Sequence, residues 1–487
     1  MRTVLKVIGN ILQIVIKGAL LIALFLGAWY YLTPFFRVER STEGDFYRNL
    51  PEQTVDVLAL GSSHMQYAFN PAILYTETGY YSYVLGSSCQ PLSMSASMLE
   101  EALKTQSPEV VVVDVFTLLP QSDVCYADGM YYKAIDEMSG CTRLEAADYV
   151  PNKEVGLTYK FDLLMNHDQW KNIDLKDIPT LIEKMKPVKG YNTDLGYVRE
   201  EPTEPRYAPL ITYQRTQKLE LSDDEKDQID RLIALCDGNK IHLMFIKTPY
   251  IIDQENTNKL HAVWDYLKTK NIEYIDYIEK AEELEWFIDM DGDTWHNNSW
   301  GAEIITGDLA KRIKEKGYVK NHKENTVYED LLKATQRIAA NSLMSSKNVN
   351  FYRLMEEGTK YPCTILLKYK GMNRTSIQEY ENNALQKLGF THDFIEDKHV
   401  DYYAIVRNGK LIQESNEPFE ANIENLHIKL DEEGIQLNGH AYCEPGEMEI
   451  YFLADDLLWV NAVPIDYESR WFWKNGCDGF DCDLSKE

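Results

Sequence analysis

Between residues 54 and 319 the chain alternates short, continuous apolar runs with longer amphipathic stretches. The run at 110–116 is mostly valine, which is typical of a strand buried on both faces. A capping box at Ser222-Asp-Asp-Glu225 predicts the start of one helix. This alternation predicts an α/β domain whose parallel sheet is covered by helices on both faces. We expect strands at 55–60, 80–85, 110–116, 241–246 and 273–277, and helices at 92–104, 222–236, 255–270 and 300–316.

Residues 118–220 interrupt this alternation and are rich in Tyr, Asp, Lys and Pro. The interruption falls between two strands that should be central in the sheet. We therefore expect this insertion to overlie the carboxyl ends of the strands, where open α/β sheets bind their ligands. It is either a substrate-binding cap or a structural decoration, and the pattern alone is compatible with both.

The pattern changes again after residue 319. The polar stretch at 320–349 predicts a linker helix, and residues 350–475 predict an accessory α+β domain. In that domain a helix should end at Gly389, and Asn408-Gly409 predicts a tight hairpin. We expect strands there at 364–370, 402–406, 423–430, 447–453 and 457–463, and a helix at 376–388.

Residues 1–36 carry a strongly apolar segment, followed by a polar linker at 37–53. The stretch at 18–36 is long enough to cross a bilayer, and Trp29 lies near its far end, where aromatic side chains favour the headgroup region. Arg2, Lys6 and Lys17 precede this stretch, which predicts a cytoplasmic N-terminus with the rest of the chain outside. The alternative is a cleaved signal peptide.

Charge and cysteine content narrow the classes of partner. The 487 residues include 77 acidic and 50 basic ones, a formal charge of −27. This excludes a nucleic-acid partner, because phosphates need a basic face. The eight cysteines show no Cys-x-x-Cys spacing, so we expect no zinc or iron–sulfur site and no cofactor. Cys125 with Cys141, and Cys477 with Cys482, are the nearest candidate disulfides, and free thiols are the alternative.

Two short segments supply the residue types that acyl transfer needs. The first strand runs into Gly61-Ser62-Ser63, a tight turn that should expose Ser63 at the edge of the sheet. A serine hydroxyl needs a neighbouring base, and Asp293-Thr-Trp-His296 offers a histidine with an acid three residues before it. We expect Ser63 to be the nucleophile, His296 the base and Asp293 the acid that orients it. His64 should bond locally or contact substrate.

These segments resemble the SGNH/GDSL hydrolase superfamily over residues 54–317. They are most similar to its membrane-anchored, extracytoplasmic members, which are associated with acyl transfer onto bacterial surface polymers. The resemblance rests on Gly61-Ser-Ser63-His64, on Gly86, and on Asp293-Thr-Trp-His296 followed by Gly301-Ala302. It implies a flavodoxin-like three-layer α/β/α sandwich. It also implies the triad Ser63, His296 and Asp293, with the amides of Ser63 and Gly86 binding the oxyanion.

The chain departs from the family pattern at two places. Ser62 stands where an acidic residue is expected, and Asp114-Val115-Phe116 replaces the Gly-x-Asn-Asp block. A carboxylate at position 114 would repel an oxyanion, so the third donor is absent or comes from another residue. Separately, the C-terminal domain resembles the interleukin-like EMT-inducer domain in Thr364-Ile-Leu-Leu and in the helix ending at Gly389, which implies a carbohydrate- or partner-binding module.

The sequence thus predicts a single-pass cell-membrane protein with an extracytoplasmic SGNH-like catalytic domain at 54–319. Its expected activity is that of a serine acyl hydrolase or O-acyltransferase acting on a cell-surface glycan, with a membrane-embedded acyl-donor protein as a further candidate partner. The alternative is a non-catalytic glycan-binding or assembly scaffold on a degenerate SGNH fold. The Ser63, Asp293 and His296 set favours the enzyme, whereas Asp114 favours the scaffold.

Overall fold

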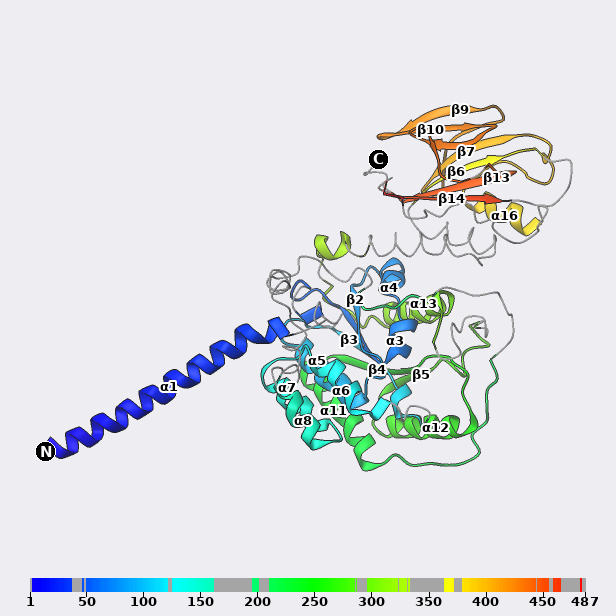
Figure 1. Cartoon of the computed structure of the whole chain (residues 1–487). Coiled ribbons are helices and arrows are strands. Elements are labelled where there is room, and N and C mark those ends of the chain that lie inside the picture. Colours follow the sequence, from blue (N-terminus) through cyan, green and yellow to red (C-terminus); the bar gives the residue numbers. More distant parts are fainter. Residues whose placement is uncertain are drawn as a thin grey trace.

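The structure is a computed structural model of the whole chain (Figure 1). It describes residues 2–36, 46–47, 50–120, 125–161, 195–200, 210–284, 286, 296–322, 324–330, 332, 363–371, 379–443, 445–454, 459–465 and 482–483.

Five parallel strands form the central sheet, in the order β2-β1-β3-β4-β5. This is the strand order of flavodoxin-like folds, and it confirms the parallel sheet that the apolar runs predict. Because the chain adds β2 on one side of β1 and β3 on the other, the topological switch point lies beside β1. The strands are β1 (Val57–Gly61), β2 (Ser82–Gly86), β3 (Val110–Asp114), β4 (His242–Lys247) and β5 (Glu273–Asp276).

Helices cover both faces of this sheet and give three layers (Figure 1). Successive strand residues point to opposite faces, so Val111 and Val113 join one buried cluster while Val110 and Val112 join the other. The first cluster includes α5 (Leu92–Ala102), α11 (Asp223–Asn239) and α12 (Gln254–Thr269). The second includes α3 (Ser63–Ala68), α4 (Pro71–Thr78) and α13 (Ser299–Lys316).

The capping box expected at Ser222 is confirmed. The Ser222 side chain accepts from the N–H of Glu225, and the Glu225 carboxylate accepts from the N–H of Ser222, so both groups that start α11 are satisfied.

The described part of the insertion is helical. It comprises η1 (Phe116–Leu118), α6 (Asp128–Ile135), α7 (Gly140–Ala146), η3 (Ala147–Tyr149) and α8 (Lys153–Tyr159). It follows β3 in the chain and packs against α5, where Ser139 O accepts from Lys104 Nζ (3.0 Å) and Ser139 Oγ donates to Glu101 Oε1 (2.7 Å). That the insertion overlies the carboxyl ends of the strands stays a prediction. Residues 195–200 then run against the sheet, where Val84 N–H donates to Leu195 O (2.9 Å) and Val198 N–H donates to Gln66 O (2.8 Å).

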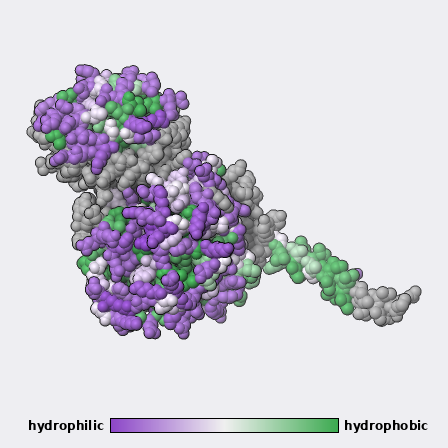
Figure 2. All heavy atoms as spheres, turned by 180° about the vertical axis from the view of Figure 1, so that it is seen from behind, coloured by the Kyte–Doolittle hydropathy of each residue, from purple (hydrophilic) through white to green (hydrophobic). Residues whose placement is uncertain are grey.

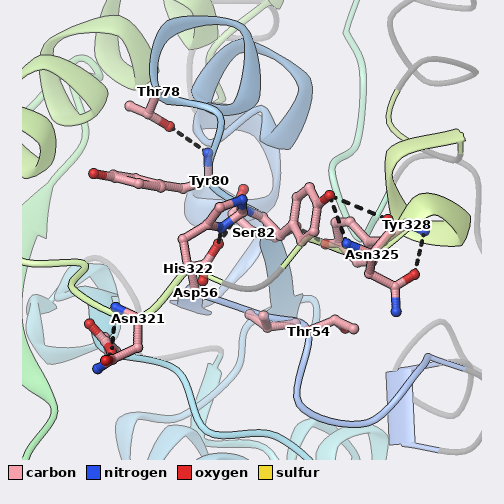
Figure 3. A network of polar contacts seen from close by, with 12 residues as sticks. Thr54, Asp56, Thr78, Tyr80, Ser82, Asn321, His322, Asn325 and Tyr328 are labelled. Carbon is pink, nitrogen blue, oxygen red and sulfur yellow. Dashed lines mark hydrogen bonds and ion pairs between the residues drawn. The ribbon is translucent and has the colours of Figure 1, made fainter.

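A polar network ties the start of the predicted linker to the amino ends of β1 and β2 (Figure 3). Asp56 Oδ2 accepts from Tyr81 N–H (2.7 Å) and pairs with His322 Nδ1 (2.7 Å). Tyr328 OH donates to Ser82 O. Burial raises the pKa of Asp56, although its bonds to Tyr81 and His322 oppose this. Residues 326–330 are helical, and most of the remaining predicted linker helix lies outside the described residues.

Two antiparallel sheets make up the C-terminal part and pack face to face around one buried cluster. The six-stranded sheet contains β6 (Cys363–Tyr369), β7 (Tyr402–Arg407), β8 (Lys410–Ser415), β13 (Met448–Ala454), β14 (Trp459–Ile465) and β15 (Cys482–Asp483). The four-stranded sheet contains β9 (Phe419–Ile423), β10 (Leu426–Asp431), β11 (Gly434–Leu437) and β12 (His440–Ala441). The helix α16 (Glu379–Lys387) completes this α+β part.

One strand prediction in this part is wrong. The single strand expected at 423–430 is the end of β9, a turn and the beginning of β10. Ile423 pairs with Leu426, so Glu424 and Asn425 form a two-residue hairpin loop, with Glu424 at φ 53°. The hairpin at Asn408-Gly409 is as expected, with φ 51° and 69°.

The N-terminal helix α1 (Arg2–Phe36) projects from the body of the molecule as an apolar rod (Figures 1 and 2). Its segment Asn10–Ala28 has a mean hydropathy of 2.3, with none of it buried against the rest of the chain. It is long and apolar enough to span a membrane, and a signal sequence has the same character.

Candidate active site

The turn after β1 places Ser63 at the switch point of the sheet. Gly61 has φ 155°, and a Cβ there would lie 3.1 Å from Met65 Cβ and 3.2 Å from Asp114 Cβ, so this position needs glycine. Ser62 caps the helix that follows, because its side chain accepts from the N–H of His64 (3.3 Å). Ser63 is therefore the first residue of α3, half-buried at the carboxyl edge of the sheet.

His296 meets Ser63 from a position 233 residues later in the chain. Its Nε2 lies 2.8 Å from Ser63 Oγ, a distance suited to proton transfer. The ring of Tyr67 stacks on the imidazole at 4.5 Å. The structure thus brings two of the expected catalytic residues together. Asp293, the expected orienting acid, lies outside the described residues.

Two buried asparagines fix the backbone beside His296. Asn298 caps α13 by accepting from the N–H groups of Trp300 (3.0 Å) and Gly301 (3.1 Å). Asn297 accepts from Trp286 Nε1 (2.9 Å) and donates to Pro249 O (3.2 Å). The loop that carries His296 is therefore held to the segment after β4.

Gly86, the expected oxyanion donor, ends β2 directly opposite Gly61 in the register. A Cβ at Gly86 would lie 2.7 Å from Gly61 O and 3.0 Å from Gln66 Cγ. Gln66, on α3, donates its side-chain N–H to Gly86 O (2.9 Å). Gly86 is therefore held close to the turn that carries Ser63.

The carboxylate of Asp114 is neutralised by a residue that sequence reasoning missed. Lys247 Nζ, at the end of the neighbouring strand β4, lies 3.3 Å from Asp114 Oδ2, with both side chains fully buried. Asp114 also accepts from Thr248 N–H (3.1 Å), Thr248 Oγ1 (3.3 Å) and Phe116 N–H (2.8 Å). The expectation that this carboxylate repels an oxyanion is corrected accordingly, since its charge is paired and its oxygens are occupied.

Lys247 also reaches His64, the residue that follows the nucleophile. Lys247 Nζ lies 3.4 Å from His64 Nδ1, and His64 is only 1% exposed. Burial lowers the pKa of Lys247, while Asp114 raises it. Burial, then the charges of Lys247 and His296, hold the pKa of His64 well below 6.5. His64 is therefore a neutral imidazole at the floor of the site.

A cavity of about 1000 Å³ begins at Thr117, and none of Ser63, His64, Gly86, Lys247 and His296 lines it. Phe116 stacks on His64 at 3.6 Å, and the next residue, Thr117, lines the cavity. The insertion contributes Tyr126, Tyr131, Asp148, Tyr149, Pro151 and Lys153 to its wall. Arg231 and Lys259, from α11 and α12, also line it and are paired with Glu100 (3.1 Å) and Glu225 (2.7 Å), respectively.

The thiols do not pair as expected from their closeness in the sequence. Cys125 is a buried free thiol that is hydrogen-bonded to the Cys89 thiol, whereas Cys141 is an exposed free thiol, so the candidate disulfide between Cys125 and Cys141 is wrong. The hydrogen bond from Cys125 lowers the pKa of Cys89 to about 7. Cys477, from the second candidate pair, lies outside the described residues. Among the described residues, no three His, Cys, Asp or Glu side chains are grouped to hold a metal ion.

The chain matches no family model and no curated protein. Among solved structures, it is similar to a protein described as lipolytic and of the G-D-S-L family, from Desulfitobacterium hafniense. The identity is 13% and the TM-score 0.26, over 52% of this chain and 97% of that one. It is also similar to a protein described as an acylhydrolase, from Bacteroides fragilis, at 12% identity and a TM-score of 0.29, over 58% of this chain and 98% of that one. At these values neither similarity assigns an activity to this chain.

Proposed function

We propose that this protein is a membrane-anchored, SGNH-type serine acyl hydrolase or O-acyltransferase that acts on a cell-surface glycan. The observation that carries the proposal is the 2.8 Å contact between Ser63 Oγ and His296 Nε2. It lies at the topological switch point of a parallel sheet, where open α/β folds bind their ligands.

The chemistry proceeds through an acyl-enzyme. His296 takes the proton of Ser63 Oγ as that oxygen attacks the carbonyl carbon of an ester, and the amides of Ser63 and Gly86 bind the resulting oxyanion. The ester bond breaks, and His296 returns the proton to the leaving alcohol. Water or a glycan hydroxyl then attacks the acyl-enzyme with His296 again as base, which gives hydrolysis or transfer. In this proposal Asp293 orients His296.

We propose that the glycan extends from Ser63 into the cavity that begins at Thr117, and the lining of that cavity suits a polar substrate. Its lining combines tyrosines, such as Tyr126 and Tyr149, with carboxylates, such as Asp148 and Asp227. Such a lining of aromatic faces and paired polar groups suits a sugar better than it suits a long acyl chain. The carboxylates and the net charge of −27 disfavour a polyphosphate, because like charges repel across a weakly screened surface. A neutral or zwitterionic glycan is the substrate class that fits.

We propose that α1 also holds this chemistry at a membrane. In the proposal α1 crosses the bilayer with its N-terminus in the cytoplasm, and the catalytic and C-terminal parts lie outside. Tethering raises the effective concentration of a nascent surface polymer, which favours transfer over hydrolysis. A membrane-embedded partner would then supply the acyl group. The neutralised Asp114 removes the feature that most favoured a non-catalytic scaffold.

The test is the O-acyl content of the surface glycan in cells that carry Ser63→Ala or His296→Ala. Ser107→Ala is the matched control, because Ser107 is an exposed serine at the opposite end of the sheet. We expect both active-site variants to change the acyl content, and Ser107→Ala to leave it as in wild type at equal protein level. Unchanged acylation in both active-site variants would replace the enzyme by the scaffold alternative.

A further inference from the structure

His64 follows the nucleophile Ser63 in the chain, yet it has no role in the acyl-transfer mechanism proposed above. Its ring is clamped, with Phe116 stacked on one side at 3.6 Å and Tyr250 edge-on at 5.2 Å. Its centroid lies 5.3 Å from that of His296, the proposed base. The imidazole is therefore held in one orientation next to the reacting groups.

Lys247 decides which ring nitrogen of His64 carries the proton. An ammonium group has three donors and no acceptor. Lys247 Nζ directs them to Asp114 Oδ2 (3.3 Å), Thr248 Oγ1 (3.0 Å) and His64 Nδ1 (3.4 Å). The Nδ1 atom must therefore accept, which places the single proton of the neutral ring on Nε2.

Asp114 keeps this arrangement in place. Its carboxylate pairs with Lys247 and accepts two backbone N–H groups, from Phe116 and Thr248. Lys247 thus has a buried counter-ion that favours its charged form, and the carboxylate is not free to draw a proton from His64. Within the described residues, Nε2 of His64 has no hydrogen-bond partner. A fixed N–H donor without a partner at the floor of a site is suited to bind developing negative charge.

We infer that the Nε2–H group of His64 is the third donor of the oxyanion hole, and that Lys247 acts through His64 as a positioning residue. The inference rests on the proposed function, because the oxyanion forms only if Ser63 attacks an ester. The His64 proton stays on Nε2 throughout: it is shared with the oxyanion in a hydrogen bond, and no bond to it breaks.

Substitution of His64 by asparagine or by glutamine distinguishes the role of Nδ1 from that of Nε2, because each amide side chain can mimic one of the two ring nitrogens. His64→Asn keeps a polar group near the position of Nδ1, facing Lys247, but lacks a donor at the position of Nε2. His64→Gln can place its N–H near the position of Nε2. We expect kcat for p-nitrophenyl acetate hydrolysis by the full-length protein to fall about 100-fold in His64→Asn and His64→Ala, with KM little changed. We expect His64→Gln to recover at least about tenfold of that loss.

A second measurement uses wild-type protein and does not depend on any variant folding. In protein labelled with ¹⁵N-histidine, the resonances of His64 should show the Nε2-protonated tautomer. The Nε2 proton should shift downfield when a fluorophosphonate adduct forms, and Ser63→Ala treated identically should show no shift.

The outcomes separate this inference from the proposed function. A reactive wild type with an equally active His64→Asn, or with an Nδ1-protonated His64, contradicts the inference alone. Activity in His64→Asn with loss in His64→Gln also contradicts it, because the contact with Lys247 would then be what matters. A folded wild type that neither hydrolyses esters nor binds fluorophosphonate contradicts the proposed function, and the inference with it.

Discussion

At the scale of single residues, Gly86 lies so close to the turn that carries Ser63 that a side chain at position 86 has no room. A methyl group there would meet the backbone oxygen of Gly61 at 2.7 Å, and backbone yields less readily than a flexible side chain. We expect Gly86→Ala to lower the free energy of unfolding by about 1–3 kcal/mol. Gly129→Ala is the control, because no atom lies within 4 Å of its added Cβ.

Urea denaturation of both variants provides the measurement. Gly129 lies within α6, where alanine is favoured over glycine by about 0.5–1 kcal/mol. The control should therefore be as stable as wild type or slightly more stable. Equal midpoints for Gly86→Ala and wild type would show that the close approach of β1 and β2 is not as tight as described.

The residues around Ser63 differ in how far the sequence can predict them. Ser63 and His296 follow from local patterns, namely a strand that ends in a tight turn and an acid three residues before a histidine. Lys247 does not, because a lysine at the end of an apolar run is typical of a strand end that reaches solvent. Only the register that pairs Asp114 with Ile246 brings the Lys247 ammonium to the Asp114 carboxylate.

At the scale of elements, Glu273 joins the edge strand β5 to its neighbours. Its carboxylate contacts His242 on β4 (2.9 Å), Tyr318 (2.5 Å) and Arg312 on α13 (3.0 Å). These bonds, that of His242 first, lower the pKa of Glu273 from 4.5 to about 2. Because the folded pKa is depressed, the stabilisation is complete above pH 4.5 and is lost as the pH falls towards 2.

We therefore expect Glu273→Gln to cost on the order of 2 kcal/mol of unfolding free energy at neutral pH. The difference from wild type should shrink steadily as the pH is lowered through that window. Glu432→Gln, in an exposed turn, should change little at any pH. Chemical denaturation at a series of pH values measures this, and a difference that stays constant with pH would contradict the assigned cause.

The central strands were predictable because each is a continuous apolar run buried on both faces. The hairpin between β9 and β10 was not, because its turn residues, Glu424 and Asn425, include no glycine to mark it. Apolar residues flank the turn on both sides, so the sequence of the two strands resembles that of a single continuous strand. Only the pairing of β9 with β10 shows that the chain turns at this point, and strand pairing cannot be read from a local sequence pattern.

At the scale of the whole molecule, the two predicted domains share apolar contacts. Trp286 and Trp300 are 1% and 2% exposed, and they belong to the same buried cluster as Ile365 and Phe452 of the C-terminal sheet. The sequence indicated separate cores because the polar stretch at 320–349 divides the apolar patterns. Long-range contacts of this kind leave no trace in local periodicity.

A chain of residues 40–320 should still fold, since the two clusters around the parallel sheet are drawn almost entirely from residues before 320. Its unfolding free energy should be lower than that of the full-length protein by about 2 kcal/mol or more, because Trp286 and Trp300 become exposed to solvent when the C-terminal sheet is removed. Denaturation followed by tryptophan fluorescence measures this. An unchanged midpoint would contradict the shared cluster, and loss of a cooperative transition would contradict independent folding.

The proposed topology is testable with Cys141, whose thiol is exposed on the insertion. A membrane-impermeant maleimide added to intact cells should label the wild-type protein, and Cys141→Ser should lose most of that label. Labelling that appears only after the cells are opened would place the catalytic part in the cytoplasm and overturn the proposed orientation.

The central claim is that Ser63, activated by His296, is an acylatable nucleophile. The most direct measurement is the reaction of the full-length protein with a fluorophosphonate, followed by peptide mass spectrometry. We predict one adduct, on Ser63, absent in Ser63→Ala, formed at least about a hundredfold more slowly in His296→Ala, and unchanged in Ser107→Ala. A folded wild-type protein that forms no adduct, or an adduct that persists in Ser63→Ala, would contradict the account.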